Sequence, residues 1–268
     1  MRIAEALVDK RGKVNDVLFS ALSDINDTYQ SGIMTTLVLS ENDRELLQAV
    51  SKELAFKRSE WLPKGKLNIE PVDMPSGFAQ TLTDKGIIKL STNDAEMTGF
   101  IPAKNFISAL RKIAVGDKLL FDEEYSVEIV WHEFLHLRTP NIEGTYINET
   151  ITQFVARHSY QELLKTIGVN MPIHQQDILS GGYAYKENIN NFRYILSRFG
   201  IDELRAAEEL QNIYLKSGNE LRSNVSEWLS SYNGKSRKKN SNILGLLDEN
   251  KTDFKKMLEK ILSYNATR

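Results

Sequence analysis

The chain has 268 residues, of which 41% are hydrophobic and 26% charged, as in an ordinary globular protein with one sizeable core or two lobes. A net charge of −2 gives no electrostatic basis for binding nucleic acid or an anionic membrane surface, and no apolar run approaches a membrane span. The chain has no cysteine, which excludes disulfides, thiol nucleophiles and cysteine-based zinc sites. The N-terminus lacks the apolar stretch of a signal peptide, so we expect a cytoplasmic protein.

The first predicted region, residues 1–62, is helical. Apolar residues recur at helical intervals over residues 3–29, and the apolar run 33–39 fits either a strand or the end of a helix. Residues 40–43 carry the serine and aspartate spacing that is typical of a helix start, and apolar positions continue the helical pattern behind them. Prolines and glycines then interrupt it.

Residues 66–92 are the best candidates for strands, because apolar and polar residues alternate and Asp84-Lys85-Gly86 fits a hairpin turn. Such a sheet has a free edge to which an extended peptide can add through backbone hydrogen bonds. A hairpin that only closes the core explains the pattern equally well. Residues 103–120 are predicted to be helical, with a break near Gly116.

The most informative stretch is His132-Glu133-Phe134-Leu135-His136, which holds two of the four histidines. In a helix, residues four apart lie on one face, so both imidazoles can reach one zinc ion at about 2.0–2.1 Å. Glu133 is then placed to act on a water at the metal. The pattern is a metalloprotease signature. The alternative is an amphipathic helix whose polar face carries two histidines.

The helix around this motif is predicted over residues 122–138. Asp122 is the expected N-cap, the acidic residues after it suit the positive end of the helix dipole, and Pro140 ends the helix. Apolar residues recur at helical spacing, and we expect this stripe to pack into a core while the histidine face lines a cleft. The stripe consists of Val127, Val130, Trp131, Phe134 and Leu135.

A catalytic zinc ion takes three protein ligands and leaves one position open, so a third ligand is needed. The extended motif with glycine at 139 and histidine at 142 is excluded, because threonine and isoleucine stand there. We favour Glu149, one turn into a second helix predicted over 146–166. Glu143, in the preceding loop, is the second choice. The other nearby candidates are His158, which should face elsewhere on the helix, and Glu162.

A His-Glu-x-x-His helix, a short loop and Asn-Glu at the start of the next helix resemble the gluzincins, zinc metallopeptidases with a glutamate as third ligand. The chain is most similar to compact bacterial members, in which that helix carries roughly Asn-Glu-Gly-x-Thr-Glu. Here it carries Asn148-Glu149-Thr150-Ile151-Thr152-Gln153, with threonine replacing glycine and glutamine replacing the last glutamate. The resemblance covers about residues 122–160.

The resemblance implies an α+β, mainly helical, zincin-like fold, in which a small sheet and the active-site helix precede a helical C-terminal lobe. It also implies a downstream tyrosine or histidine that stabilises the oxyanion. Tyr183 is the position to which we carry this role, with Tyr185 next. Asn148 and Glu143 are candidates to orient the histidines through their second ring nitrogens.

After a loop at residues 180–183, we expect three helices over 185–232. Residues 233–240 are polar and basic, so they are predicted to be a solvated linker rather than a nucleic-acid contact. An amphipathic helix over about 243–264 closes the chain. The predicted organisation is a helical region at 1–62, a metallopeptidase domain at 63–233, and a basic linker with a C-terminal helix at 234–268.

These features predict a metallopeptidase in which His132, His136 and Glu149 hold Zn²⁺ and Glu133 is the general base toward a peptide or protein substrate. Two alternatives stay open. One is a zinc hydrolase of a non-peptide amide, and the other is a non-catalytic interaction or assembly protein that keeps a zincin fold. The terminal helices leave room for a partner protein, whereas no nucleic-acid or membrane partner is expected.

Overall fold

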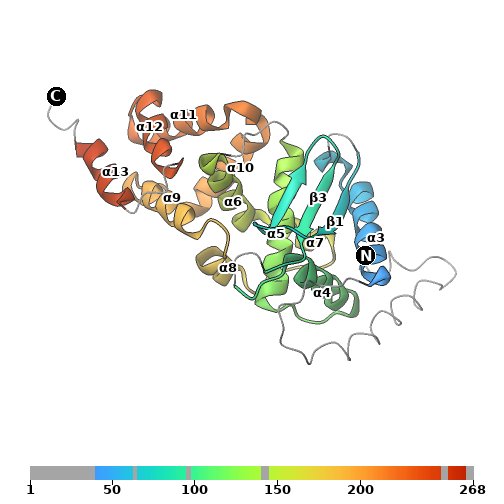
Figure 1. The fold of residues 1–268 in the computed structure, drawn as a ribbon. Helices are drawn as coiled ribbons and strands as arrows, with labels where there is room; N and C mark the ends of the chain where they lie inside the picture. Colours follow the sequence, from blue (N-terminus) through green and yellow to red (C-terminus); the bar gives the residue numbers. More distant parts are fainter. Residues whose placement is uncertain (1–39, 63–64, 95–97, 140–144, 249–252, 264–268) are drawn as a thin grey trace. The chain divides into compact units, whose positions relative to one another are not determined.

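The computed structural model describes residues 40–62, 65–94, 98–139, 145–248 and 253–263, which form a mainly helical α+β protein with one small sheet (Figure 1). They divide into two compact units that alternate along the chain. Unit 1 takes the described residues up to Arg138 together with Tyr160–Ser180, and unit 2 takes the others. The predicted domain 63–233 therefore contributes to both units. The predicted elements within 3–29 and 33–39 lie outside the described residues.

Unit 1 contains a three-stranded sheet with helices packed against it. In the sheet, β1 (Asn68–Val72) lies parallel to the central strand β3 (Ile87–Ser91), and β2 (Ala79–Leu82) lies antiparallel to it. The predicted hairpin turn joins β2 to β3, with Gly86 at a φ of 67°. β2 is therefore an edge strand. The helices are α3 (Glu41–Lys57), α4 (Pro102–Val115), α5 (Phe121–Arg138), α7 (Gln161–Thr166), α8 (Gln175–Gly181) and the short 3-10 helix η1 (Ser59–Trp61).

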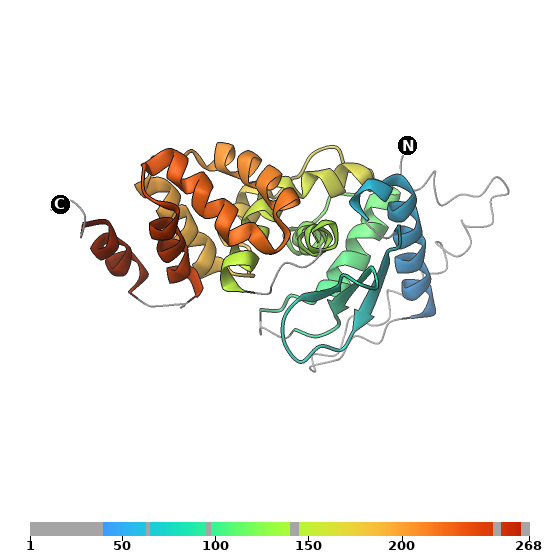
Figure 2. The ribbon, with the colours of Figure 1, turned by 90° about the horizontal axis from the view of Figure 1, so that it is seen from above.

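Helix α3 starts where the sequence predicts it. The Ser40 hydroxyl accepts the Asp43 N–H while the Asp43 carboxylate accepts the Ser40 N–H, a reciprocal cap that satisfies two backbone donors. Its buried face packs along β1 (Figure 2). Helix α4 ends at Val115, and its C-cap Gly116, with a left-handed φ of 81°, lies at the predicted break; the helix predicted over 103–120 does not continue past it.

Helix α5 is buried on nearly all sides, which corrects the prediction of one apolar stripe and one cleft-lining face. It packs against β2, β3, α4, α7 and η1. The rings of its Trp131 and of Trp61 meet edge to face, with their centroids 4.8 Å apart. The helix begins at Phe121, so Asp122 lies inside its first turn. The Leu120 N–H is donated to Glu123 Oε2 at 2.7 Å. Most of its polar residues are buried as well, so the spacing of the apolar residues did not predict which faces of the helix are buried.

Two buried carboxylates tie α5 to its surroundings in unit 1. Glu124 is fully buried and accepts hydrogen bonds from the Tyr160 hydroxyl and from the N–H groups of Ile173 and His174 at 2.6 to 3.0 Å. Burial and the Glu124 bond raise the pKa of Tyr160 well above its usual range, so the phenol stays a donor. Glu123 similarly accepts from Ser108 at 2.7 Å. These hydrogen bonds offset the free-energy cost of burying the two carboxylates.

Unit 2 is a bundle in which α6 (Tyr146–Ser159) packs against several later helices. The three helices predicted over 185–232 are present, and α11 (Leu221–Asn233) and α12 (Arg237–Asp248) lie side by side (Figure 2). The single amphipathic helix predicted over about 243–264 is not one helix: α12 ends at Asp248 within that range, and a separate helix begins at Phe254. The remaining elements are α9 (Lys186–Arg198), α10 (Glu203–Ser217), η2 (Gly218–Glu220) and α13 (Phe254–Ser263).

Three further predicted elements differ from the structure. The helix predicted over 146–166 is two helices, α6 and α7, which meet at Tyr160, the residue anchored to Glu124. The predicted loop at 180–183 begins later, because α8 runs to Gly181. The predicted basic linker is helical from Arg237 onward. Asn240 explains the last error, since this fully buried amide bonds to α11, a role that composition does not reveal.

Among the described residues, no helix combines the length and the apolar character that crossing a bilayer requires.

Candidate metal centre

The two motif histidines face each other on α5. Their Nε2 atoms lie 3.0 Å apart, and their ring centroids are 4.8 Å apart. In a tetrahedral site with zinc–nitrogen bonds of 2.0–2.1 Å, two ligand nitrogens are about 3.4 Å apart. The distance between the two Nε2 atoms is therefore close to the distance between two nitrogen ligands of one cation. His132 is 4% exposed, whereas His136 is half-buried.

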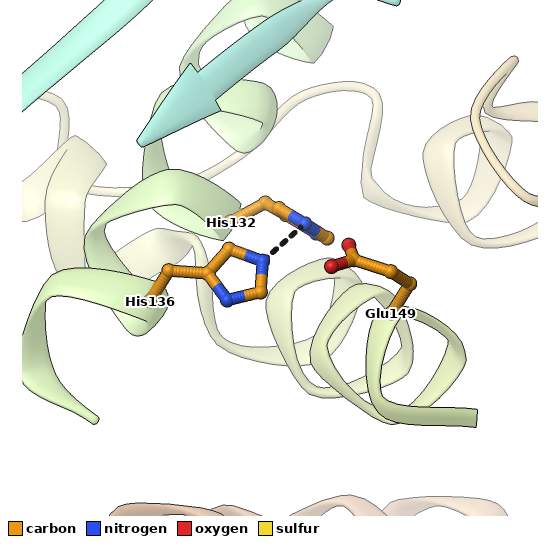
Figure 3. A group of neighbouring side chains, drawn as sticks. All are labelled: His132, His136 and Glu149. Carbon is orange, nitrogen blue, oxygen red and sulfur yellow. Dashed lines mark hydrogen bonds between the residues drawn. The ribbon is translucent and has the colours of Figure 1, made fainter. Parts of the chain in front are cut away.

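Glu149 lies in the first turn of α6 and belongs to the same group. Its carboxylate and the two imidazoles each offer a ligand atom, and these atoms all lie within 4.8 Å of one another. Figure 3 shows the side chains of His132, His136 and Glu149 pointing toward one another. Two imidazole nitrogens with one carboxylate oxygen suit zinc and several other divalent metal ions. The group can hold a metal ion.

Glu133, the predicted general base, is placed by a contact that the sequence did not indicate. The Thr81 hydroxyl of β2 donates to Glu133 Oε2 at 2.5 Å and lies 3.1 Å from the Glu133 carbonyl oxygen. Glu133 itself is 7% exposed. The edge strand therefore fixes the carboxylate next to His132. Residues 81 and 133 are far apart in the sequence, and no local pattern links them.

A tyrosine-containing segment of unit 2 lies beside Glu149. The Tyr185 hydroxyl lies 3.3 Å from Glu149 Oε2, so the second-choice residue for the oxyanion role is close to a candidate ligand. Tyr185 has a φ of 52°, a left-handed conformation that non-glycine residues seldom adopt. Tyr183, the first choice, is half-buried two residues earlier, and its role stays a prediction.

Arg157 of α6 holds that segment. Its side chain is buried, and Nη2 donates to the carbonyl oxygens of Gly182 and Ala184 at 2.9 and 2.7 Å. Breaking such bonds leaves a buried charge without compensation, so the contact fixes the backbone that carries both tyrosines. Sequence reasoning missed Arg157. Its available signal was an arginine directly after the apolar run Phe154-Val155-Ala156.

The other ligand candidates have different partners. His158 Nδ1 donates to the Phe154 carbonyl oxygen at 2.8 Å, and its Nε2 lies 3.1 Å from the carboxylate of Glu203, which agrees with the prediction that it is not a ligand. Glu162 lies 4.0 Å from Arg138. Glu143 is outside the described residues. Asn148 is buried beside Glu149, and its predicted role in orienting a histidine stays a prediction.

Comparisons of the chain with protein families, with curated proteins and with solved structures found no match.

Proposed function

We propose that the protein is a zinc-dependent metallopeptidase of the gluzincin type with a zincin-like fold. The observation that carries this proposal is the convergence of His132, His136 and Glu149 within 4.8 Å of one another, with Glu133 adjacent on α5. A structural metal site does not need a carboxylate beside its ligands, whereas hydrolysis does need a base there. The cytoplasmic location predicted from the sequence stays a prediction.

Held by His132, His136 and Glu149, a zinc ion would lower the pKa of a bound water to about 7 and so supply a nucleophile at neutral pH. Glu133 accepts the proton of the attacking water and delivers it to the leaving amine, while Thr81 keeps its carboxylate oriented. A phenol from the segment that carries Tyr183 and Tyr185 donates a hydrogen bond to the developing oxyanion.

The edge strand supports a peptide as the substrate. β2 pairs with β3 on one side, and its Thr81 side chain contacts the proposed base. An extended peptide that adds to the outer edge of β2 gains backbone hydrogen bonds and brings a scissile carbonyl close to Glu133. A small non-peptide amide gains no such bonds, so the same edge favours the peptidase over the alternative amide hydrolase.

Glu133→Gln tests the proposal. We expect the variant to bind as much metal as the wild type. Its cleavage of a peptide library, measured by mass spectrometry, should be at least about 10²-fold slower. The control Glu187→Gln, at an exposed position of α9, should cleave at the wild-type rate. Metal bound by the wild type without any peptide cleavage would instead favour the non-catalytic protein or the hydrolase of another amide.

A further inference from the structure

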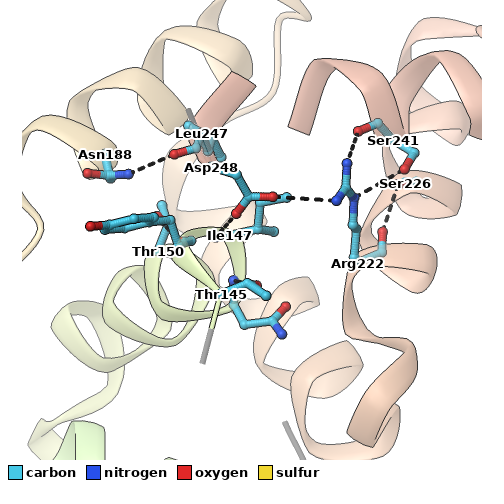
Figure 4. Close-up of polar contacts among 11 residues, drawn as sticks. Thr145, Ile147, Thr150, Asn188, Arg222, Ser226, Ser241, Leu247 and Asp248 are labelled. Carbon is cyan, nitrogen blue, oxygen red and sulfur yellow. Dashed lines mark hydrogen bonds and ion pairs between the residues drawn. The ribbon is translucent and has the colours of Figure 1, made fainter. Parts of the chain in front are cut away.

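Asp248, at the end of α12, stands in an unfavourable place for its own helix. The C-terminal end of a helix carries partial negative charge, so a carboxylate there is repelled by the dipole. Its oxygens instead bind elsewhere within unit 2. Oδ1 accepts the N–H of Ile147 at 3.1 Å, and Oδ2 lies 3.4 Å from Arg222 of α11 (Figure 4).

The Ile147 N–H belongs to the first turn of α6, where backbone donors have no partner within the helix. The neighbouring Asn148 N–H is donated to the Thr145 hydroxyl at 3.3 Å. Asp248 therefore supplies a second cap, from a residue 101 positions later in the chain, and its charge suits the positive end of the α6 dipole. Glu149 lies two residues after Ile147 in the same turn.

Arg222 keeps Asp248 in this position. Its guanidinium donates to the Ser241 carbonyl oxygen at 2.9 Å and so lies along α12 (Figure 4). Gly245 permits this approach, because a Cβ at that position would lie 2.8 Å from Arg222 Nη2. The amide of Asn188 also donates to the Leu247 carbonyl oxygen at 3.1 Å, which fixes the backbone next to Asp248.

We propose that Asp248 is a positioning residue, which holds the first turn of α6 and thereby the ligand carboxylate of Glu149. This inference rests on the proposed function, because it assigns Asp248 a role in metal affinity. A helix end without its caps frays. A fraying first turn holds Glu149 in place for only part of the time, and apparent affinity falls by that fraction.

Asp248→Ala removes the cap, and Asp248→Asn keeps an oxygen that accepts the Ile147 N–H. The matched control is Asp202→Ala, which removes the carboxylate cap of α10, where Asp202 accepts the Arg205 N–H at 2.9 Å. Amide hydrogen exchange in the metal-free full-length protein and zinc affinity by chelator competition are measured for all four proteins. Melting temperatures are measured alongside to compare the general loss of stability.

For Asp248→Ala we expect faster exchange at residues 147–149 and about 10-fold weaker zinc binding, the lower end of what outer contacts of a metal ligand contribute. Asp248→Asn should recover most of both. Asp202→Ala should melt earlier but bind zinc as the wild type does. Unchanged exchange in Asp248→Ala, or faster exchange with unchanged zinc affinity, would overturn the inference. A wild type that binds no zinc would contradict the proposed function itself, and the assigned role of Asp248 would fail with it.

Discussion

At the scale of single residues, Thr81 is the contact that sequence reasoning did not find and that most directly concerns the proposed base. Its hydroxyl is the donor that the structure gives to Glu133 Oε2 from the edge strand. The motif predicts which side chains would act in catalysis, and their roles stay a prediction. It did not predict what orients them, because orientation depends on a strand 52 residues earlier in the chain.

Thr81→Val keeps the shape of the side chain and removes the donor. We expect the turnover number to fall about 10-fold, because the carboxylate of Glu133 loses a bond that fixes its direction. The metal content should not change. Thr81→Ser, which retains the hydroxyl, should stay within about twofold of the wild type. Equal turnover in the valine variant and the wild type would show that this bond does not matter for catalysis.

Tyr160→Phe tests the buried carboxylate of α5. The substitution removes one of three donors to the fully buried Glu124. The Glu124 carboxylate then lacks one hydrogen-bond donor, and we expect the free energy of unfolding to fall by about 1–3 kcal/mol. Chemical denaturation of the metal-free protein measures it. A loss well under 1 kcal/mol would mean that another group replaces the phenol.

At the scale of elements, the sequence predicted where α3, β2, β3 and α9 to α11 lie, because caps, turns and periodic apolar residues are local signals. It misjudged α5, because a helix that is buried on nearly all sides with polar residues bonded inside looks amphipathic. It also missed the break at Tyr160. That break coincides with a long-range bond to Glu124, which no local pattern contains.

The hairpin turn offers an element-scale test with a matched control. A Cβ at Gly86 would lie 2.3 Å from the backbone oxygen of Lys66, and the residue has a positive φ. Gly77 also has a positive φ but nothing within 4 Å of its Cβ position. Gly77→Ala should therefore cost about 1–2 kcal/mol of unfolding free energy, from its left-handed conformation alone. Gly86→Ala should cost clearly more, and equal costs would contradict the close approach.

At the scale of the whole molecule, the division into units could not be read from the sequence. The described residues within 139–159 belong to unit 2, although the described residues on both sides of them belong to unit 1. Composition and spacing describe neighbours along the chain, whereas the units are defined by packing between distant segments. The prediction that the terminal helices bind a partner protein stays a prediction, since residues 1–39 lie outside the described residues.

The acid stability of the protein should depend on Glu203 in unit 2. Burial raises the pKa of this carboxyl, but hydrogen bonds and ion pairs with His158 and Arg193 outweigh burial and lower it to about 2. A lowered pKa stabilises the fold above the ordinary carboxyl pKa, and this contribution is lost as the pH falls from about 4.5 to 2. With allowance for solvent screening of a half-exposed group, it is on the order of 1–2 kcal/mol.

Glu203→Gln should therefore reduce the unfolding free energy at pH 7 and flatten its dependence on pH between about 5 and 2. Denaturant titrations at a series of pH values measure both effects. A variant whose pH profile runs parallel to that of the wild type would show that Glu203 titrates normally in the folded protein.

The central claim is that His132, His136 and Glu149 hold one divalent cation, and metal analysis of the purified protein after zinc loading and desalting tests it most directly. We predict about one zinc ion per chain in the wild type and in the control His174→Gln, whose histidine bonds to the Leu119 carbonyl oxygen. His136→Ala and Glu149→Ala should lose the ion. A wild type without zinc, or a His136→Ala variant that retains as much zinc as the wild type, would contradict the claim.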